Sequence, residues 1–139
     1  MSADLREHFT RKATAVGSTV TVSADGPSAR EIVGGEAGDH SAIALFAVAE
    51  TGSVAVALPR EERGRCLLAE RLWLLVPADE LVPTLDVALE RIEALVRTGT
   101  PYVTLMTGPS RTADIERALT VGVHGPRELH VILVDGPLP

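Results

Sequence analysis

The run LWLLV, residues 72–76, is the sequence feature that most limits the fold of this chain. It is strongly apolar, too short for a buried helix and followed directly by Pro77, so it predicts a central strand rather than a helix. The composition suits buried parallel strands covered by helices, because 45% of the residues are hydrophobic and most of these are Val, Leu and Ala. The 139 residues are enough for one continuous core, so we expect a single domain over residues 1–139.

Helical and strand patterns alternate along the rest of the chain. Apolar residues at helical spacing predict helices over residues 3–15, 84–96 and 112–119, and a further helix from Pro27 to the pair Gly34-Gly35. Strands are expected at residues 18–23, 72–76, 102–107 and 129–134, and residues 42–59 predict a strand, a tight turn and a second strand. Residues 34–40 and the charged cluster at 60–65 are expected to be polar loops. This order predicts an α/β fold with a Rossmann-like, mostly parallel sheet and helices on both faces.

Charge, cysteine content and hydropathy exclude several classes of function. The net charge is −6 and no dense Lys/Arg run is present, so nucleic acid is not an expected partner. Cys66 is the only cysteine, which excludes an internal disulfide or a metal site built from several thiolates; we expect a buried, inert thiol and no metal site. No apolar run approaches the roughly 20 residues of a membrane span, and the start of the chain does not look like a signal peptide. We therefore expect a soluble, cytoplasmic protein without membrane contact.

The segment GPSRTADIE, which begins at Gly108, is the first candidate binding site. It follows a predicted strand and opens a predicted helix, whose first peptide N–H groups lack intrahelical partners and attract anions. Gly108 would let the backbone approach a ligand, and Ser110 and Thr112 would offer hydroxyl groups. Arg111 would bind a carboxylate or phosphate through two guanidinium N–H groups. An equally weighted alternative is that Ser110 or Thr112 only caps the helix while Arg111 is solvated.

The turn GVHGP is the second candidate and precedes the last predicted strand. His124, followed by Gly125, could transfer a proton or donate a hydrogen bond to an anion, because its unperturbed pKa is near ~6.5. A lone histidine in a turn is more often structural. We expect the GVHGP turn to begin the next strand of the same sheet and to lie close to the GPSRT turn.

The segment AETG is the third candidate. It places Glu50 beside Thr51 and Gly52 at the end of a predicted strand, where a carboxylate could act as a base, a nucleophile or a hydroxyl binder at the crevice of an α/β sheet. The simpler interpretation of the segment alone is a hairpin turn in which Glu50 faces water.

Taken in order, the segments AVAETGSVAV, LWLLVPADELVPTLDVAL and TLMTGPSRTADIERALTVGVHGPRELHVILVD closely resemble the LUD domain family, of the lactate utilization protein C type. The resemblance covers residues 44–134 and, less specifically, the opening helix and strand. It implies a fold similar to the NagB/RpiA/CoA-transferase group. It also implies a bacterial system that oxidises L-lactate to pyruvate, in which the partners are iron–sulfur subunits and a further LUD-containing subunit.

The chain is a shortened form of this pattern. Members of the family usually carry an additional helix and strand between the opening strand and the AETG segment, where this chain has only the polar loop Gly34–His40. The loss would remove a sheet edge or part of a cleft wall, and a homodimer could compensate for it.

Three functional hypotheses follow. The first is a LUD component of a lactate oxidation system that binds a small carboxylate or anionic cofactor around Glu50, Ser110, Arg111 and His124. No redox group is encoded in the chain and the cofactor is unknown, so electrons would pass through a partner or a bound nucleotide. The second is a non-catalytic assembly or regulatory module. The third, suggested by fold analogy alone, is a CoA-transferase or cyclo-ligase-like enzyme that uses Glu50.

Overall fold

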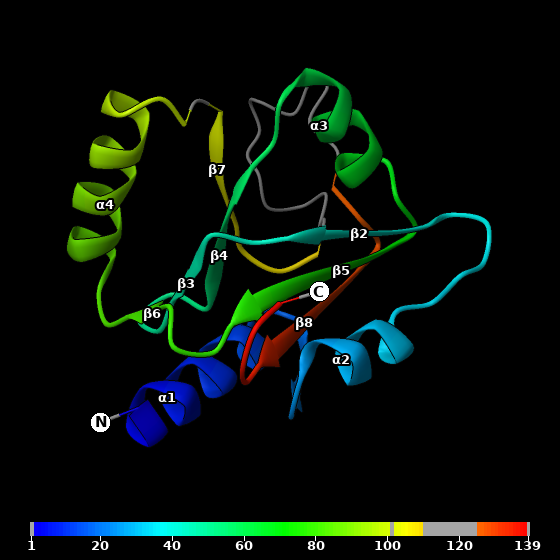
Figure 1. Ribbon diagram of the computed structural model, residues 1–139, viewed down its shortest axis with the longest axis horizontal. Coiled ribbons are helices and arrows are strands. Elements are labelled where there is room, and N and C mark those ends of the chain that lie inside the picture. The colour runs from blue at the N-terminus through cyan, green and yellow to red at the C-terminus, as the bar shows by residue number, and fades with distance from the viewer. Residues whose placement is uncertain (1, 101, 110–124, 139) are drawn as a thin grey trace.

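The computed structural model describes residues 2–100, 102–109 and 125–138. Within these ranges the strands form two four-stranded sheets (Figure 1). One sheet is wholly parallel and has the order β1-β8-β5-β2, with strands at Thr19–Ser23, Glu128–Val134, Arg71–Pro77 and Asp39–Ile43. The other has the order β6-β3-β4-β7, with strands at Leu81–Val82, Phe46–Val48, Ser53–Ala57 and Val103–Met106. In this second sheet β4 runs antiparallel to both of its neighbours, whereas β6 is parallel to β3.

The described helices cover the outer faces and the sides of the two sheets. They are α1, α2, α3 and α4, at Ser2–Ala15, Gly26–Ile32, Arg60–Leu67 and Leu85–Arg97. Figure 1 shows α2 beside the parallel sheet and α4 beside the second sheet, on opposite sides of the molecule. Phe9 and Ala13 of α1 and Cys66 of α3 reach the core that lies between the two sheets. None of the helices in the described ranges is long and apolar enough to cross a membrane.

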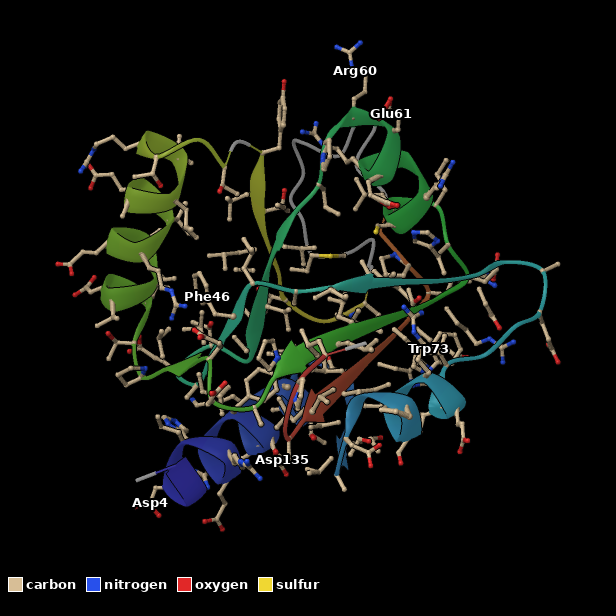
Figure 2. The ribbon with its side chains drawn as sticks, viewed as in Figure 1. Asp4, Phe46, Arg60, Glu61, Trp73 and Asp135 are labelled. Carbon is tan, nitrogen blue, oxygen red and sulfur yellow. The ribbon has the colours of Figure 1, made fainter. Side chains whose placement is uncertain are left out.

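Strand β5 shows why the run LWLLV is apolar without interruption. Its residues Leu72, Leu74 and Val76 pack into the core between the sheets, whereas Trp73 and Leu75 pack against α2. Trp73 is buried on this second face (Figure 2). Because both faces are covered, alternation of polar and apolar residues is absent, as expected for a central strand of a parallel sheet.

Most predicted elements are confirmed, including the α/β class and the parallel sheet with helices. The helix expected at residues 3–15 is α1, the one expected at 84–96 is α4, and the one opened by Pro27 is α2. The strands expected at residues 18–23, 72–76, 102–107 and 129–134 are β1, β5, β7 and β8. The hairpin around residues 50–52 is formed by β3 and β4. The helix expected at residues 112–119 lies outside the described residues.

The first apolar run of residues 42–59 differs from the prediction, because it supplies two strands rather than one. Residues 39–43 belong to β2 of the parallel sheet, and residues 46–48 belong to β3 of the second sheet. The N–H of Ala44 donates to Leu75 O (2.9 Å), and the N–H of the next residue, Leu45, donates to Ala55 O (2.8 Å). The chain therefore passes from one sheet to the other between two consecutive residues, a step that leaves no mark in the sequence because residues 42–49 are all apolar.

Two loop predictions are wrong for physical reasons. Residues 60–65 form most of α3, because their charged side chains cover the exposed face of a helix that is anchored by buried Cys66. Arg60 and Glu61 project outward from its first turn (Figure 2). The polar loop expected at Gly34–His40 ends at Gly38, since β2 starts at Asp39 and pairs with β5.

A capping contact begins α2. The Asp25 carboxylate accepts a hydrogen bond from the N–H of Ser28 (2.7 Å), and Pro27 occupies the first turn. The hydrogen bond from the Ser28 backbone, followed by one from the Ser28 side chain, lowers the pKa of Asp25 below its ordinary value. A lowered folded-state pKa means that the carboxylate stabilises the fold above the pKa of the unfolded chain, near 3.8, and that this contribution disappears as the pH falls through the lower folded value.

We predict that Asp25→Ala lowers the melting temperature at pH 7. The difference from the native chain should become smaller, without disappearing, as the pH falls below 3.8, because the protonated carboxyl group is a weaker acceptor of the Ser28 N–H. The matched control is Asp25→Asn, whose amide oxygen also accepts the bond but does not titrate. Its melting temperature should stay close to the native value at pH 7. Thermal unfolding followed by circular dichroism across this pH range measures both, and a pH-independent effect of Asp25→Ala would contradict the assignment.

Candidate functional site

Three hydroxyl groups form a connected chain where the AETG turn meets the end of β7. Ser53 Oγ lies 2.7 Å from Thr51 Oγ1 and 2.7 Å from Thr107 Oγ1. The hydroxyl chain runs from half-buried Thr51 through buried Ser53 to exposed Thr107, so the Thr107 end reaches the surface. The antiparallel pairing of β4 with β7 sets this geometry, because Val54 pairs with Met106. Ser53, which precedes Val54, and Thr107, which follows Met106, therefore meet at the end of the sheet. The arrangement links Thr51 with the segment that leads into GPSRT.

Two candidate glycines lie against the end of α1. Gly52 has φ +71°, and a Cβ added to it would lie 2.5 Å from the backbone N of Ala13. Gly108 has φ +75°, and its Cβ would lie 2.3 Å from Val16 O. Both positions need glycine for the backbone conformation and for the close approach to helix α1. The AETG turn and the start of GPSRT are therefore held beside the same stretch of chain.

Glu50 is exposed and makes a specific contact. It occupies the turn between β3 and β4, and its Oε1 accepts a hydrogen bond from the N–H of Leu85 (2.7 Å), the first residue of α4. Thr84 caps the same helix through a bond from the N–H of Val87 to its Oγ1 (3.2 Å). A carboxylate at this place complements the partial positive charge of the helix start. The contact gives Glu50 a structural role in joining the turn to α4.

The other predicted site residues divide between described and undescribed parts of the chain. Gly125 is half-buried and stands just before β8. Ser110, Arg111, Thr112 and His124 lie outside the described residues, so their roles stay predictions.

The two turns do not flank neighbouring strands of one sheet, as the sequence analysis expected. Strand β7, which precedes Gly108, belongs to the second sheet, whereas β8, which follows Gly125, belongs to the parallel sheet. Val16, against which Gly108 packs, comes just before β1, and Gly125 comes just before β8, the parallel neighbour of β1. Gly108 and Gly125, the described glycines of these two segments, therefore lie at the amino end of the parallel sheet, opposite to the carboxyl end where open α/β sheets usually bind ligands.

Sequence reasoning missed a cluster of three potential metal ligands. His40 Nε2 lies 3.3 Å from Glu62 Oε1, and these two groups and the Cys66 thiol have ligand atoms within 4.8 Å of one another. Burial, followed by the negative charge of Glu62, raises the pKa of Cys66 to about 11, so the thiol is protonated near neutral pH. The burial agrees with the predicted inert thiol, but the neighbouring His40 was not foreseen. His40 belongs to β2 and precedes Glu62 by 22 residues, so no local spacing connects the two. The one sequence signal for the cluster is the spacing of Glu62 and Cys66, which stand four residues apart on one face of α3.

A second polar group at the amino end of the parallel sheet is structural. The Arg71 guanidinium donates to both oxygens of Asp39 (2.8 and 3.2 Å) and to Glu36 (2.9 Å). Burial alone would raise the pKa of Asp39, but hydrogen bonds from the Glu36 N–H and from Arg71 outweigh it and hold the pKa below its ordinary value. Trp73 stacks on His130 with ring centres 4.7 Å apart. These contacts join β2, β5 and β8 side by side.

A comparison with known protein families shows to which family the chain belongs. The profile of the LUD domain matches residues 42–134, which include the AETG turn and the whole of β4 to β8. The chain belongs to the LUD domain family. The match confirms the resemblance of the motifs AETG, GPSRT and GVHGP.

The LUD chain is also similar to individual proteins. It is 38% identical over 91 residues to lactate utilization protein C of Deinococcus radiodurans, covering 63% of this chain and 42% of that protein. For the proteins of the same name from Macrococcus caseolyticus and Geobacillus thermodenitrificans, the identity is 36% over 92 and 98 residues, covering 63% and 67% of this chain and 40% of each relative. The chain thus matches well under half the length of these relatives.

A solved structure supports the fold of the chain independently. The crystal structure of a DUF162 family protein from Deinococcus radiodurans superimposes with a TM-score of 0.70 at 20% identity, over 98% of this chain and 99% of that chain. At this identity the likeness establishes the arrangement of strands and helices alone.

We predict that Gly52→Ala and Gly108→Ala each cost at least about 2 kcal/mol in the free energy of unfolding, since the left-handed backbone costs about 1–2 kcal/mol for alanine before any clash. The matched control is Gly64→Ala in α3, where an added Cβ meets nothing within 4 Å. It should leave the free energy of unfolding unchanged or raise it by about 0.5–1 kcal/mol. Urea denaturation measures all three, and equal stabilities would show that the turns are not packed as described.

Proposed function

We propose that this LUD domain is a component of a bacterial lactate utilization system and binds a small carboxylate, such as lactate or pyruvate, or an anionic cofactor. The observation that carries the proposal is the 36–39% identity to proteins named lactate utilization protein C over 91–93 residues. The activity of those longer proteins is not transferred by the match alone, because less than half of their length is matched. The geometry of the turns supplies a second line of support.

The hydroxyl chain suits an anion at the surface end. Three hydroxyl groups carry three hydrogens, and the two contacts between Ser53, Thr51 and Thr107 use two of them. One O–H is therefore left to donate, and it belongs to Thr107 when Thr51 donates to Ser53 and Ser53 donates to Thr107. Thr107 is exposed and directly precedes Gly108, so a ligand there would be close to the start of GPSRT. In the proposal, Arg111 supplies the positive charge and Ser110 and Thr112 add donors.

Electron transfer would need another molecule. The chain has one cysteine, and its thiol is buried, so it cannot hold an iron–sulfur cluster by itself. We infer that iron–sulfur subunits of the same system take the electrons from lactate, either directly or through a nucleotide bound by this domain. His124 would handle a proton at the site.

We predict that isothermal titration calorimetry detects binding of L-lactate or pyruvate to the pure chain or to the chain with its partner subunits. Thr107→Ala should weaken binding about 10-fold and Arg111→Ala about 10- to 100-fold, the values of one neutral and one charged hydrogen bond. The control is Arg97→Ala, which removes an exposed arginine paired only with Glu93 on α4. Absence of binding under both conditions, or equal weakening by all three variants, would refute the proposed site.

An assembly or regulatory module is the second candidate function, and the Glu50 contact favours it. The Glu50 carboxylate accepts the N–H of Leu85 and so joins the turn to α4. This structural role does not require Glu50 to take part in a reaction. The CoA-transferase-like alternative instead requires the same carboxylate to attack a substrate. Trapping of a covalent adduct on Glu50 would support that alternative.

We predict that Glu50→Gln preserves growth of the native host on L-lactate and lowers the stability of the pure protein by about 0.3–1 kcal/mol, the value of a charge at a helix start. The amide oxygen can still accept the N–H of Leu85, whereas Glu50→Ala cannot and should be less stable. Growth curves and thermal unfolding measure the two effects. A stable Glu50→Gln protein that no longer supports growth would instead assign proton transfer or nucleophilic chemistry to Glu50.

A further inference from the structure

The cluster of His40, Glu62 and Cys66 lies apart from the hydroxyl chain and has no role in the proposed function. Glu62 and Cys66 stand four residues apart on α3, so their side chains share one helical face. His40 comes from β2, and its side chain reaches Glu62. Ala42 and Ala44, two and four residues along the chain, pack into the core between the sheets. His40 shares their face of β2, which brings its ring to the same side as α3.

The donor set is one that transition metals prefer. A nitrogen, a carboxylate oxygen and a sulfur together suit Zn²⁺, which takes Cys, His and Asp/Glu ligands, better than Mg²⁺ or Ca²⁺, which prefer oxygen alone. Two ligands at positions i and i+4 of a helix with a third from elsewhere is an arrangement also used by zinc enzymes.

The separations are compatible with a single ion. Zinc–ligand bonds of about 2.0 to 2.3 Å at tetrahedral angles place neighbouring ligand atoms roughly 3.3 to 3.6 Å apart. The observed separation of His40 Nε2 and Glu62 Oε1 is 3.3 Å, and all three ligand atoms lie within 4.8 Å of one another. Closure on an ion therefore needs a movement of about one ångström by the thiol or the glutamate, within the reach of side-chain rotation.

We propose that His40, Glu62 and Cys66 form a binding site for a zinc-like divalent cation. Binding converts the Cys66 thiol to a thiolate, and the proton passes to solvent. The site has three protein ligands, so a fourth position remains for water or a small anion. This inference does not rest on the proposed function, because none of the three residues takes part in it.

The His40 and Glu62 side of the cluster is open to solvent. Glu62 lines a hollow of about 330 Å³ together with Arg30, Ser41 and residues of β2 and β5. The His40 and Glu62 side chains are 23% and 34% exposed, whereas Cys66 is buried. An ion can thus enter from the His40 and Glu62 side, with the sulfur at its inner end.

The test uses the full chain, freed of metal with a chelator and then titrated with Co²⁺ and with Zn²⁺. Cobalt reports on its ligands, since a thiolate ligand produces a charge-transfer band in the near ultraviolet and tetrahedral coordination produces intense visible bands. We expect one Co²⁺ per chain with both signals, displacement by Zn²⁺, and a higher melting temperature in the presence of Zn²⁺.

Variants of each ligand make the test specific. His40→Ala and Glu62→Gln should each weaken binding by about 100-fold or more, as losses of direct ligands exceed the 10- to 100-fold effect of outer contacts. Cys66→Ser should remove the charge-transfer band. The control is Glu61→Gln, an exposed neighbour on α3 that should bind like the native chain. Because His40 and Glu62 are partly exposed, their variants should fold even if Cys66→Ser does not.

Three results would overturn the proposal. The first is the absence of stoichiometric Co²⁺ or Zn²⁺ binding by the native chain. The second is binding that persists unchanged in His40→Ala and Glu62→Gln. The third is a cobalt spectrum without the charge-transfer band, which would place any bound ion away from Cys66. In each case the contact of His40 with Glu62 is a hydrogen-bonded or ionic pair only.

Discussion

The passage of the chain from β2 to β3 is the constraint on which the rest of the structure depends. Ala44 donates its N–H to Leu75 in the parallel sheet, and Leu45 donates its N–H to Ala55 in the second sheet. These bonds tie two sheets together through consecutive residues, with no loop between them to absorb a change of position. Side chains from both sheets meet in the core between them, including Ala47, Val54, Leu74 and Val131. The AETG turn follows directly from β3, so its place is determined by the same passage.

The sequence predicted those helices, strands and turns that hydrophobic periodicity or turn-forming residues indicate. The 3.6-residue pattern of residues 84–96 gave α4, and the Glu50-Thr51-Gly52 turn separated β3 from β4. The change of sheet at Ala44 was not predictable, because residues 42–49 are all apolar and so have no alternation that could reverse. Helix α3 was missed because its apolar anchor, Cys66, follows the charged segment instead of alternating with it.

The sequence predicted the glycines of the candidate site but not the contacts between its distant residues. Motifs mark local backbone requirements, so Gly52 and Gly108 were found, and both occupy positions that exclude a side chain. Long-range contacts leave no such mark. Ser53 connects Thr51 with Thr107, which lies 54 residues away from it, and no spacing rule joins those three hydroxyl groups. His40 and Glu62 escaped notice in the same way.

The two polar sites of this domain have different relations to the LUD family. The hydroxyl chain lies wholly within the matched segment of residues 42–134, so relatives that share the segment are where an equivalent should be sought. The cluster on α3 is divided by the boundary, since Glu62 and Cys66 lie inside the segment and His40 lies two residues before it. His40 lies in β2, directly after the loop that replaces the additional helix and strand of longer family members. A helix and strand inserted at that loop would change what precedes β2 and could cover the hollow beside Glu62. The metal site therefore has to be examined in this chain itself, because family membership argues neither for it nor against it.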